Sequence, residues 1–265
     1  MGEQKGIIRL RGKVGNVSFY HQDGVDLAKT PGGATKEQIM KDPRFVRVRE
    51  NMSEFGGSAM VGKAFRDSIA EVLPVMKGQY LTGRVTAKFR TICTLGTGTR
   101  GQRDIVIVAN KAIIVGLNFS IVKLFSAIFS APYSLVANAG RNETTLTIPD
   151  FNTSNYINPP EGATHCRFVN AASILSDYKF NTTIKVYEPL NPTINGLNIV
   201  AYSAYIPLGG MVGGVTTVVS TIAGSPTMVS SAGLIGCIGI EFYQVVNSSY
   251  YLLNAENAMR IEDVF

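Results

Sequence analysis

The chain has 265 residues, of which 45% are apolar and 17% are charged, so it can bury a core and is not a disordered protein. Its net charge of +6 is unevenly placed. Residues 1–112 carry 19 Lys and Arg against 10 Asp and Glu, whereas the rest of the chain is slightly acidic. Frequent Gly and the absence of Trp favour a loop-rich β protein over a helical enzyme.

Residues 6–29 are predicted to form short strands that belong to an N-terminal β arm over residues 1–34. Gly15-Asn16 and Asp23-Gly24 are turn dipeptides between apolar β-formers, and Thr30-Pro31-Gly32-Gly33 interrupts the chain. A short hairpin is marginal alone, so we expect this arm to dock on the body of the protein or on a neighbouring subunit.

A basic helical segment is predicted for residues 35–103. Thr35 and Gln38 form a capping-box pattern, and apolar or small residues then recur every three or four positions up to Met76. The predicted stripe comprises Phe45, Val48, Met52, Phe55, Ala59, Gly62, Phe65, Ile69, Leu73 and Met76. Pro43 is expected to start or kink the helix, and a second helical piece carries Leu81, Val85, Phe89 and Ile92 on one face.

Two glycine patterns in this segment resemble nucleotide-binding loops without meeting their requirements. Gly57–Lys63 fits G-x-x-x-x-G-K, but Ala64 replaces the Ser or Thr that magnesium coordination needs. Gly96–Gly101 fits G-x-G-x-x-G, but it follows a helix and precedes a strand, the reverse of the dinucleotide motif. We therefore interpret the first as close helix packing and the second as a loop.

From residue 104 onward the apolar period changes to that of strands, and residues 104–265 are predicted to be one β domain. The predicted strands, separated by Asn-, Gly- and Pro-rich turns, are 105–108, 113–117, 127–136, 144–148, 166–169, 182–187, 197–205, 215–222, 234–246 and 250–253. The fold class is therefore α+β: an N-terminal arm and helical segment followed by an antiparallel β-sandwich, jelly-roll or immunoglobulin-like. Glu262-Asp263 is interpreted as a solvated end.

One long stretch has no ionisable side chain except tyrosine and cysteine. From Pro189 to Ile240 there is no Asp, Glu, Lys or Arg. Its Thr, Ser, Gly and Pro content argues against a membrane span. Exposed edge strands usually carry charges that deter pairing, so we expect another subunit to cover part of this surface.

No catalytic, cofactor-binding or metal-binding residue is predicted. The two histidines, His21 and His165, lie in no metal or triad motif, and the three cysteines are expected to be reduced, partly buried thiols. No enzyme activity and no small-molecule substrate are expected, and a membrane partner is not favoured. The N-terminus lacks an apolar signal region, so synthesis in the cytoplasm is expected, with the final location left open.

Three short motifs resemble uncharacterised protein families of Bacteroidota and their mobile elements. They are Gly12–Val17 (GKVGNV), Asp42–Phe45 (DPRF) with Arg49–Gly56 (RENMSEFG), and Phe242-x-Gln244-x-x-Asn247 with Tyr250-x-Leu252. The resemblance implies a short strand before an Arg-rich helix and a variable β domain. It implies no activity.

The leading functional hypothesis is a structural, self-assembling subunit of a filament, tube or virion-like shell. The candidate subunit-contact residues are Ile8, Leu10, Val14, Val17, Phe19, Arg44, Arg47, Arg49, Arg100 and Arg103. One alternative is a nucleic-acid-associated structural protein that uses the basic residues 1–112. Another is a surface attachment module whose β-domain tyrosines bind carbohydrate or a receptor, with Tyr178, Tyr187, Tyr202, Tyr205 and Tyr243 as candidates.

Overall fold

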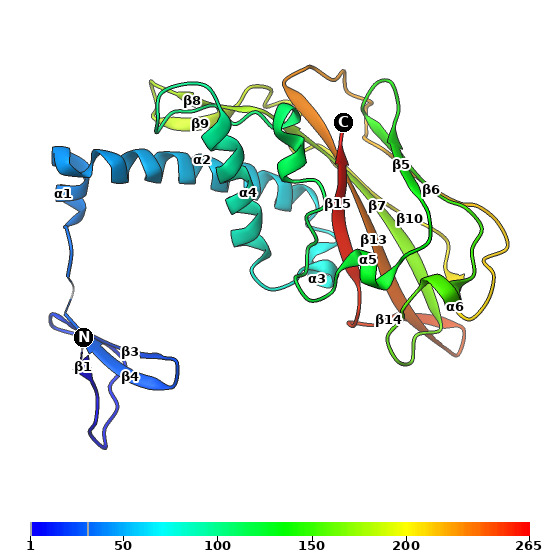
Figure 1. Ribbon diagram of the computed structural model, residues 1–265, viewed down its shortest axis with the longest axis horizontal. Coiled ribbons are helices and arrows are strands. Elements are labelled where there is room, and N and C mark those ends of the chain that lie inside the picture. The colour runs from blue at the N-terminus through cyan, green and yellow to red at the C-terminus, as the bar shows by residue number, and fades with distance from the viewer. Residues whose placement is uncertain (1, 31) are drawn as a thin grey trace. The chain divides into compact units, whose positions relative to one another are not determined.

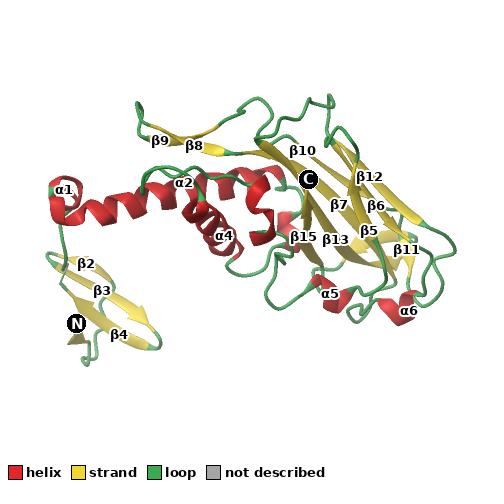
Figure 2. Cartoon of the chain, turned by 45° about the horizontal axis from the view of Figure 1, so that its top comes forward, coloured by secondary structure: helices red, strands yellow, loops and turns green. Residues whose placement is uncertain are grey.

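The computed structural model of the chain describes residues 2–30 and 32–265 and divides it into two compact units. The first is Met1–Arg49 and the second is Glu50–Phe265. The division falls inside the segment that the sequence predicts to be helical, because the long helix α2 (Val46–Ser68) runs through it. Figures 1 and 2 show the helices and strands of the two units.

The first unit contains a four-stranded antiparallel sheet in the order β1-β4-β3-β2, a larger element than the predicted hairpin. Its strands are β1 (Gly2–Glu3), β2 (Gly12–Val14), β3 (Val17–Gln22) and β4 (Val25–Lys29). Both predicted turns are present, and φ is +51° at Asp23 and +82° at Gly24, the left-handed conformation of tight hairpins. No described residue from 2 to 49 is buried, so this sheet has no core of its own.

A short helical stretch follows the sheet and confirms the predicted capping box. In α1 (Lys36–Lys41) the Thr35 hydroxyl accepts from the Gln38 amide, and the Gln38 side chain accepts from the Thr35 amide. The helix ends before Pro43, which begins the 3₁₀ turn η1 (Pro43–Phe45). Pro43 therefore separates α1 from α2, as its missing N–H and fixed φ require.

The second unit places its helices against one face of a large sheet. The helices are α2, α3 (Leu73–Met76) and α4 (Leu81–Leu95). The buried side of α2 is made by Glu54, Gly57, Ser58, Val61 and Phe65, whereas Met52 and Phe55 are exposed. The N-terminal half of the predicted stripe was therefore assigned to the wrong face, while the stripe of α4 is confirmed, with Leu81, Val85, Phe89 and Ile92 buried.

The large antiparallel sheet has six strands and is built around two long central ones, β7 (His165–Ser176) and β13 (Ala232–Val246). The outer strands are β10 (Asn198–Tyr202), β11 (Ile206–Pro207), β14 (Ser249–Leu252) and β15 (Ala258–Val264). β15 pairs with β13, so Glu262-Asp263 lies in a strand and not in a solvated end. β7 and β13 are buried along most of their length, because both faces of the sheet are covered.

A three-stranded sheet covers the face opposite the helices (Figures 1 and 2). It consists of β12 (Thr216–Thr221), β6 (Glu143–Ile148) and β5 (Ser134–Ala137). Between the two sheets lies one apolar cluster with Phe129, Leu146, Phe168 and Ile240, and between the large sheet and the helices lies another with Phe65, Phe89, Val169 and Cys237. The α+β class and the mostly antiparallel sheets are thus as predicted.

The remaining elements are short and sit in the connections. They are β8 (Tyr178–Asn181) paired with β9 (Val186–Pro189), the 3₁₀ helix η2 (Val108–Ile113), α5 (Phe125–Ile128) and α6 (Thr153–Tyr156). The strands predicted at 105–108 and 113–117 are wrong. These segments form turns and η2. Ile105 makes only an isolated antiparallel bridge with Tyr178, and Gly116 and Leu117 exchange hydrogen bonds with Ile261 of β15.

Candidate functional site

The apolar candidate contact residues all lie in the N-terminal unit and keep much of their surface. Ile8 is 79% exposed, Val14 is 61% exposed and Leu10 is 44% exposed, while Val17 and Phe19 are half-buried in β3. The neighbouring Ile7 is fully exposed. The loop between β1 and β2 therefore presents Ile7, Ile8 and Leu10 between basic residues.

Intramolecular contacts are made by the basic candidates Arg44, Arg49, Arg100 and Arg103. Arg44 pairs with Asp42 at 2.7 Å, Arg49 donates to the Ile39 and Asp42 carbonyls, and Arg100 contacts Asn51 and Glu50. Arg103 binds Glu54 through two hydrogen bonds. Arg47 lies exposed in the first turn of α2. Their assignment as subunit contacts stays a prediction.

Glu54 is the centre of a buried ionic cluster that fixes the glycine-rich loop. Its carboxylate accepts from Arg103 and from the Gly101 amide at 2.7 Å, and it forms an ion pair with Arg90 at 2.8 Å. Burial acts to raise the pKa of Glu54, but the bonds from Arg103 and Gly101 and the charge of Arg90 outweigh it and hold the pKa below its usual value. The loop after α4 is therefore clamped onto α2 by charge, which is a structural use of Arg103.

The resemblance of Gly57–Lys63 to a phosphate loop is explained by packing. These residues lie inside α2, and a Cβ on Gly57 would lie 2.4 Å from Cδ2 of Tyr187. The Tyr187 hydroxyl in turn donates to the Arg103 carbonyl. The small residue allows β9 to approach the helix, as the sequence interpretation expected.

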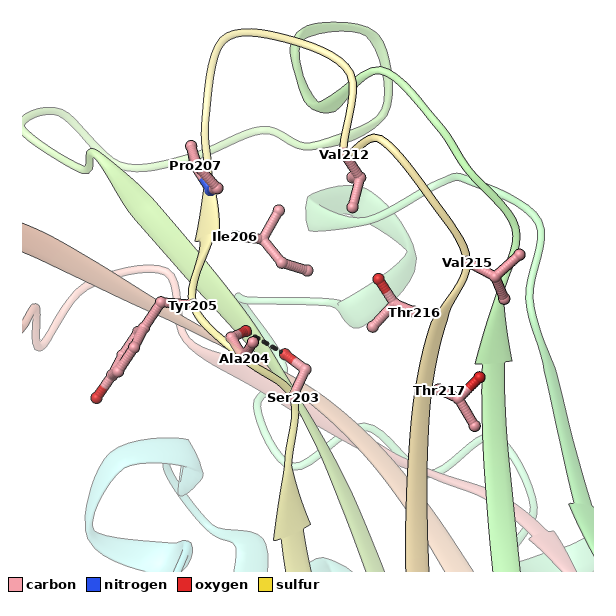
Figure 3. A pocket seen from close by; sticks show the side chains of 9 residues that line it. All are labelled: Ser203, Ala204, Tyr205, Ile206, Pro207, Val212, Val215, Thr216 and Thr217. Atoms are coloured by element: carbon pink, nitrogen blue, oxygen red, sulfur yellow. Dashed lines mark hydrogen bonds between the residues drawn. The ribbon is translucent and has the colours of Figure 1, made fainter.

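A candidate binding surface lies where the two sheets of the second unit separate (Figure 3). The segment Ser203–Pro207 and the start of β12, Val215–Thr217, line an opening of about 330 Å³ together with Val212. Ile206 and Val212 point into it, whereas Tyr205 points to the other side of its strand. We call this opening the seam.

Both borders of the seam are edges of sheets. β10 and β11 pair with β7 only, and β12 pairs with β6 only, within residues 2–30 and 32–265. Neither border contains a charged side chain, and Val215 is 63% exposed. The loop between them is held by Thr153, whose hydroxyl accepts from the Gly209 and Gly210 amides. The seam is thus a pre-shaped, charge-free opening between two strand edges, lined by both apolar and hydroxyl side chains.

Away from the seam, Asn170 connects the two sheets. Its buried carboxamide donates to the Thr144 and Val218 carbonyls and accepts from the Thr144 hydroxyl. β12 is therefore tied to β7 by side-chain bonds while its outer edge remains unpaired.

On the helix side of the large sheet, aromatic residues gather around Arg167. The guanidinium carbon of Arg167 lies 3.8 Å from the ring centre of Tyr202, and its Nε donates to Glu241 at 2.9 Å. Tyr243 donates to the same carboxylate oxygen, and burial together with Glu241 raises the pKa of Tyr243, so its hydroxyl keeps its proton. Tyr205 stacks on Tyr250 with ring centres 3.8 Å apart. We call these six residues the Arg167 cluster.

Sequence reasoning found half of this cluster. Tyr202, Tyr205 and Tyr243 were candidates, whereas Tyr178 and Tyr187 are buried elsewhere in the helix-side core. Arg167, Glu241 and Tyr250 were missed, because only the pairing of β7 with β13 and of β13 with β14 brings them together. Alternation along β7 and β13 would place Arg167 and Glu241 on one face once that register is known.

No protein-family model, no curated protein and no solved structure matches this chain. The resemblance of its short motifs to Bacteroidota families therefore stays a prediction. Among the residues that the structure describes, no three His, Cys, Asp or Glu side chains are grouped as metal ligands. In the same residues, no helix combines the length and apolar character needed to cross a membrane. Cys93, Cys166 and Cys237 are free and buried, as predicted.

Proposed function

We propose that this chain is a self-associating structural subunit whose seam receives part of a second copy. The observation that carries the proposal is the pair of charge-free, unpaired strand edges on the two sides of one opening. Charged side chains are a common protection of sheet edges in monomeric proteins, and an edge without them favours pairing with another chain. A filament, tube or virion-like shell is the kind of assembly that this pairing would build.

The N-terminal unit supplies a suitable occupant. Its sheet contains no buried side chain in the described residues, so it gains little from folding alone. Its first loop carries Ile7, Ile8 and Leu10, which match Ile206 and Val212, the apolar side chains that point into the seam. We assign this loop of one copy to the seam of the next copy. We also propose that the unit Glu50–Phe265, which contains the seam, belongs to the jelly-roll or immunoglobulin-like sandwich class.

The assembly is tested by placing a charge at the seam. Val215→Lys puts an ammonium group at the exposed start of β12, and we expect it to shift the protein toward monomers in light scattering. Val136→Lys is the matched control, since Val136 is 53% exposed on β5, the other edge of the same sheet. A wild-type protein that stays monomeric at every concentration and salt, or equal effects of both variants, contradicts the proposal.

The assignment of the occupant needs a separate test. One preparation carries Ile8→Cys and another carries Val215→Cys, so a disulfide between the two can form only between copies. The native cysteines are buried and give little background. We expect a cross-linked dimer when the two preparations are mixed under mild oxidation. Failure to cross-link, with assembly intact, would leave self-association standing and refute the assignment of the N-terminal loop.

A further inference from the structure

The guanidinium of Arg167 is held in one orientation, but two of its nitrogens make no hydrogen bond with the residues that the structure describes. Stacking on Tyr202 and the Nε bond to Glu241 fix its plane. In the described part of the chain, the hydrogen bond and the ion pair with Glu241 are the only polar contacts of Arg167. Its Nη1 and Nη2 make no hydrogen bond there, and neither atom is fully buried. Nη1 and Nη2 therefore keep free donors on a side chain that is 23% exposed, and two guanidinium nitrogens held in one plane can bind a carboxylate with two parallel hydrogen bonds.

A partly exposed aromatic platform lies beside this pair of donors. The stacked rings of Tyr205 and Tyr250 are 37% and 43% exposed, and Tyr243 meets the first of them edge to face at 4.9 Å. His165 lies 5.2 Å from the Tyr250 ring, and its Nδ1 is 3.0 Å from the Thr164 hydroxyl. Its Nε2 is thus the ring nitrogen left for a ligand. Tyrosine combines an apolar surface with a polar tip, which suits a ligand of mixed character.

We propose that the Arg167 cluster, with His165, binds an acidic sugar: a pyranose that carries a carboxylate. The carboxylate would bind Nη1 and Nη2 of Arg167. The C–H face of the ring would pack on the Tyr205 and Tyr250 pair, and the sugar hydroxyls would bond with the phenol hydroxyls and His165.

The charge of the cluster separates this ligand from a nucleic-acid backbone. Glu241 lies next to Arg167 and largely offsets its charge within the cluster. Binding to a polyphosphate backbone depends on several cations that displace counterions, and a single arginine that is already paired with Glu241 does not supply them. A single carboxylate needs only the directional donors. Affinity for one sugar is expected to be weak, and repeated copies in an assembly would raise it through avidity.

The test compares two glycosides that differ at one carbon. Methyl β-D-glucuronide carries a carboxylate where methyl β-D-glucoside carries a neutral CH₂OH group, and binding of each to the full-length protein is followed by saturation-transfer NMR. We expect the glucuronide to bind at least about tenfold more tightly, since one good charged pair of hydrogen bonds contributes about 1.5–3 kcal/mol.

Three variants locate the binding. Arg167→Gln should remove the preference for the glucuronide, and Tyr250→Ala should weaken the binding of both glycosides. Tyr251→Ala is the control, because Tyr251 is the next residue of β14, is 57% exposed and points to the opposite face. Tyr250 lies at the surface, so its variant keeps the test valid even if Arg167→Gln does not fold.

The outcomes are decisive in both directions. Preference for the glucuronide that disappears in Arg167→Gln and is kept in Tyr251→Ala supports the site. Equal binding of both glycosides, binding that survives both cluster variants, or no transfer at roughly 10 mM glucuronide, well above a millimolar Kd, would overturn it. Displacement of the glucuronide by equimolar inorganic phosphate would overturn the sugar assignment in favour of a general anion site.

Discussion

The carboxylate of Glu54 receives the guanidinium of Arg103 through two parallel hydrogen bonds, of 2.7 Å from Nε and 2.8 Å from Nη2. Glu54 is completely buried, and Arg90 and the Gly101 amide complete its surroundings. The pair joins α2 to the loop after α4, which are separated by about fifty residues of chain. Its removal should therefore loosen the helical side of the second unit.

Glu54→Gln should lower the free energy of unfolding by about 3–5 kcal/mol, because it leaves two largely buried arginines without a counter-charge. Urea unfolding at neutral pH measures the change. Asp67→Asn on the same helix is the control, since Asp67 pairs with Lys63 in solvent and its loss should cost less than about 1 kcal/mol. Equal losses in the two variants would contradict the structural role of Glu54.

The same carboxylate makes stability depend on acid. Because the pKa of Glu54 is lower in the folded protein than in the unfolded chain, its contribution is complete above the ordinary glutamate pKa. The contribution is lost as the pH falls through the lowered value. Wild-type protein should therefore lose stability in acid more steeply than Glu54→Gln, as measured by urea midpoints across that range. Parallel curves would refute this linkage.

Asp177 is expected to show the opposite pH dependence. Burial raises its pKa, and the bond from the Ile107 amide at 2.7 Å offsets this only in part. A raised pKa in the folded state means that stability is lost as the pH rises through it. Asp177→Asn keeps an acceptor for Ile107 and removes the charge, so it should be at least as stable as wild type at neutral pH. The difference should disappear in acid, and a less stable variant at pH 7 would contradict the prediction.

Two adjacent glycines of α2 should respond oppositely to the same substitution. Gly57→Ala places a Cβ against the ring of Tyr187 and should cost about 1–3 kcal/mol through overpacking. Gly56→Ala meets no heavy atom within 4 Å and should stabilise the helix by roughly 0.5–1 kcal/mol. Thermal unfolding of the two variants provides the comparison. If both substitutions stabilise the protein, or both destabilise it, the ring of Tyr187 does not pack against Gly57.

Asn170→Ala should loosen the contact between the two sheets. It removes two donated bonds and one accepted bond between buried groups, at a cost of more than about 2 kcal/mol. Relative to wild type, amide hydrogen exchange in this variant should accelerate more in β12 and β6 than in β7. Asn198→Ala, which removes an exposed bond to the Gly196 carbonyl, should change stability by less than about 0.5 kcal/mol. Unchanged exchange in β12 would show that Asn170 does not tie the sheets.

The sequence predicts those elements whose signals are local. The capping box at Thr35, the helix Leu81–Leu95 and the strand Thr216–Thr221 each follow from residues within one element. The buried face of α2 was missed because it consists of Glu54, Gly57 and Ser58, which read as polar or neutral until their partners are known.

The candidate sites depend on pairing between distant strands. The seam exists because β10 and β12 belong to different sheets, and no local pattern shows that their edges stay unpaired. Arg167 meets Glu241 and Tyr243 through the register of β7 on β13. The charge-free stretch did indicate the borders of the seam, since charges that would protect an edge are absent from the sequence itself.

The central strand β13 has a consequence for how the protein is made. Its partner β15 comes last, and Met259 and Ile261 of β15 complete the same core as Phe65 and Phe89. The helices leave the ribosome long before that strand exists, so the part of their core that β15 completes stays open until synthesis has passed residue 264. Folding of the second unit is therefore expected to finish only after translation of β15, and a chain stalled before it would be a target for chaperones and proteases.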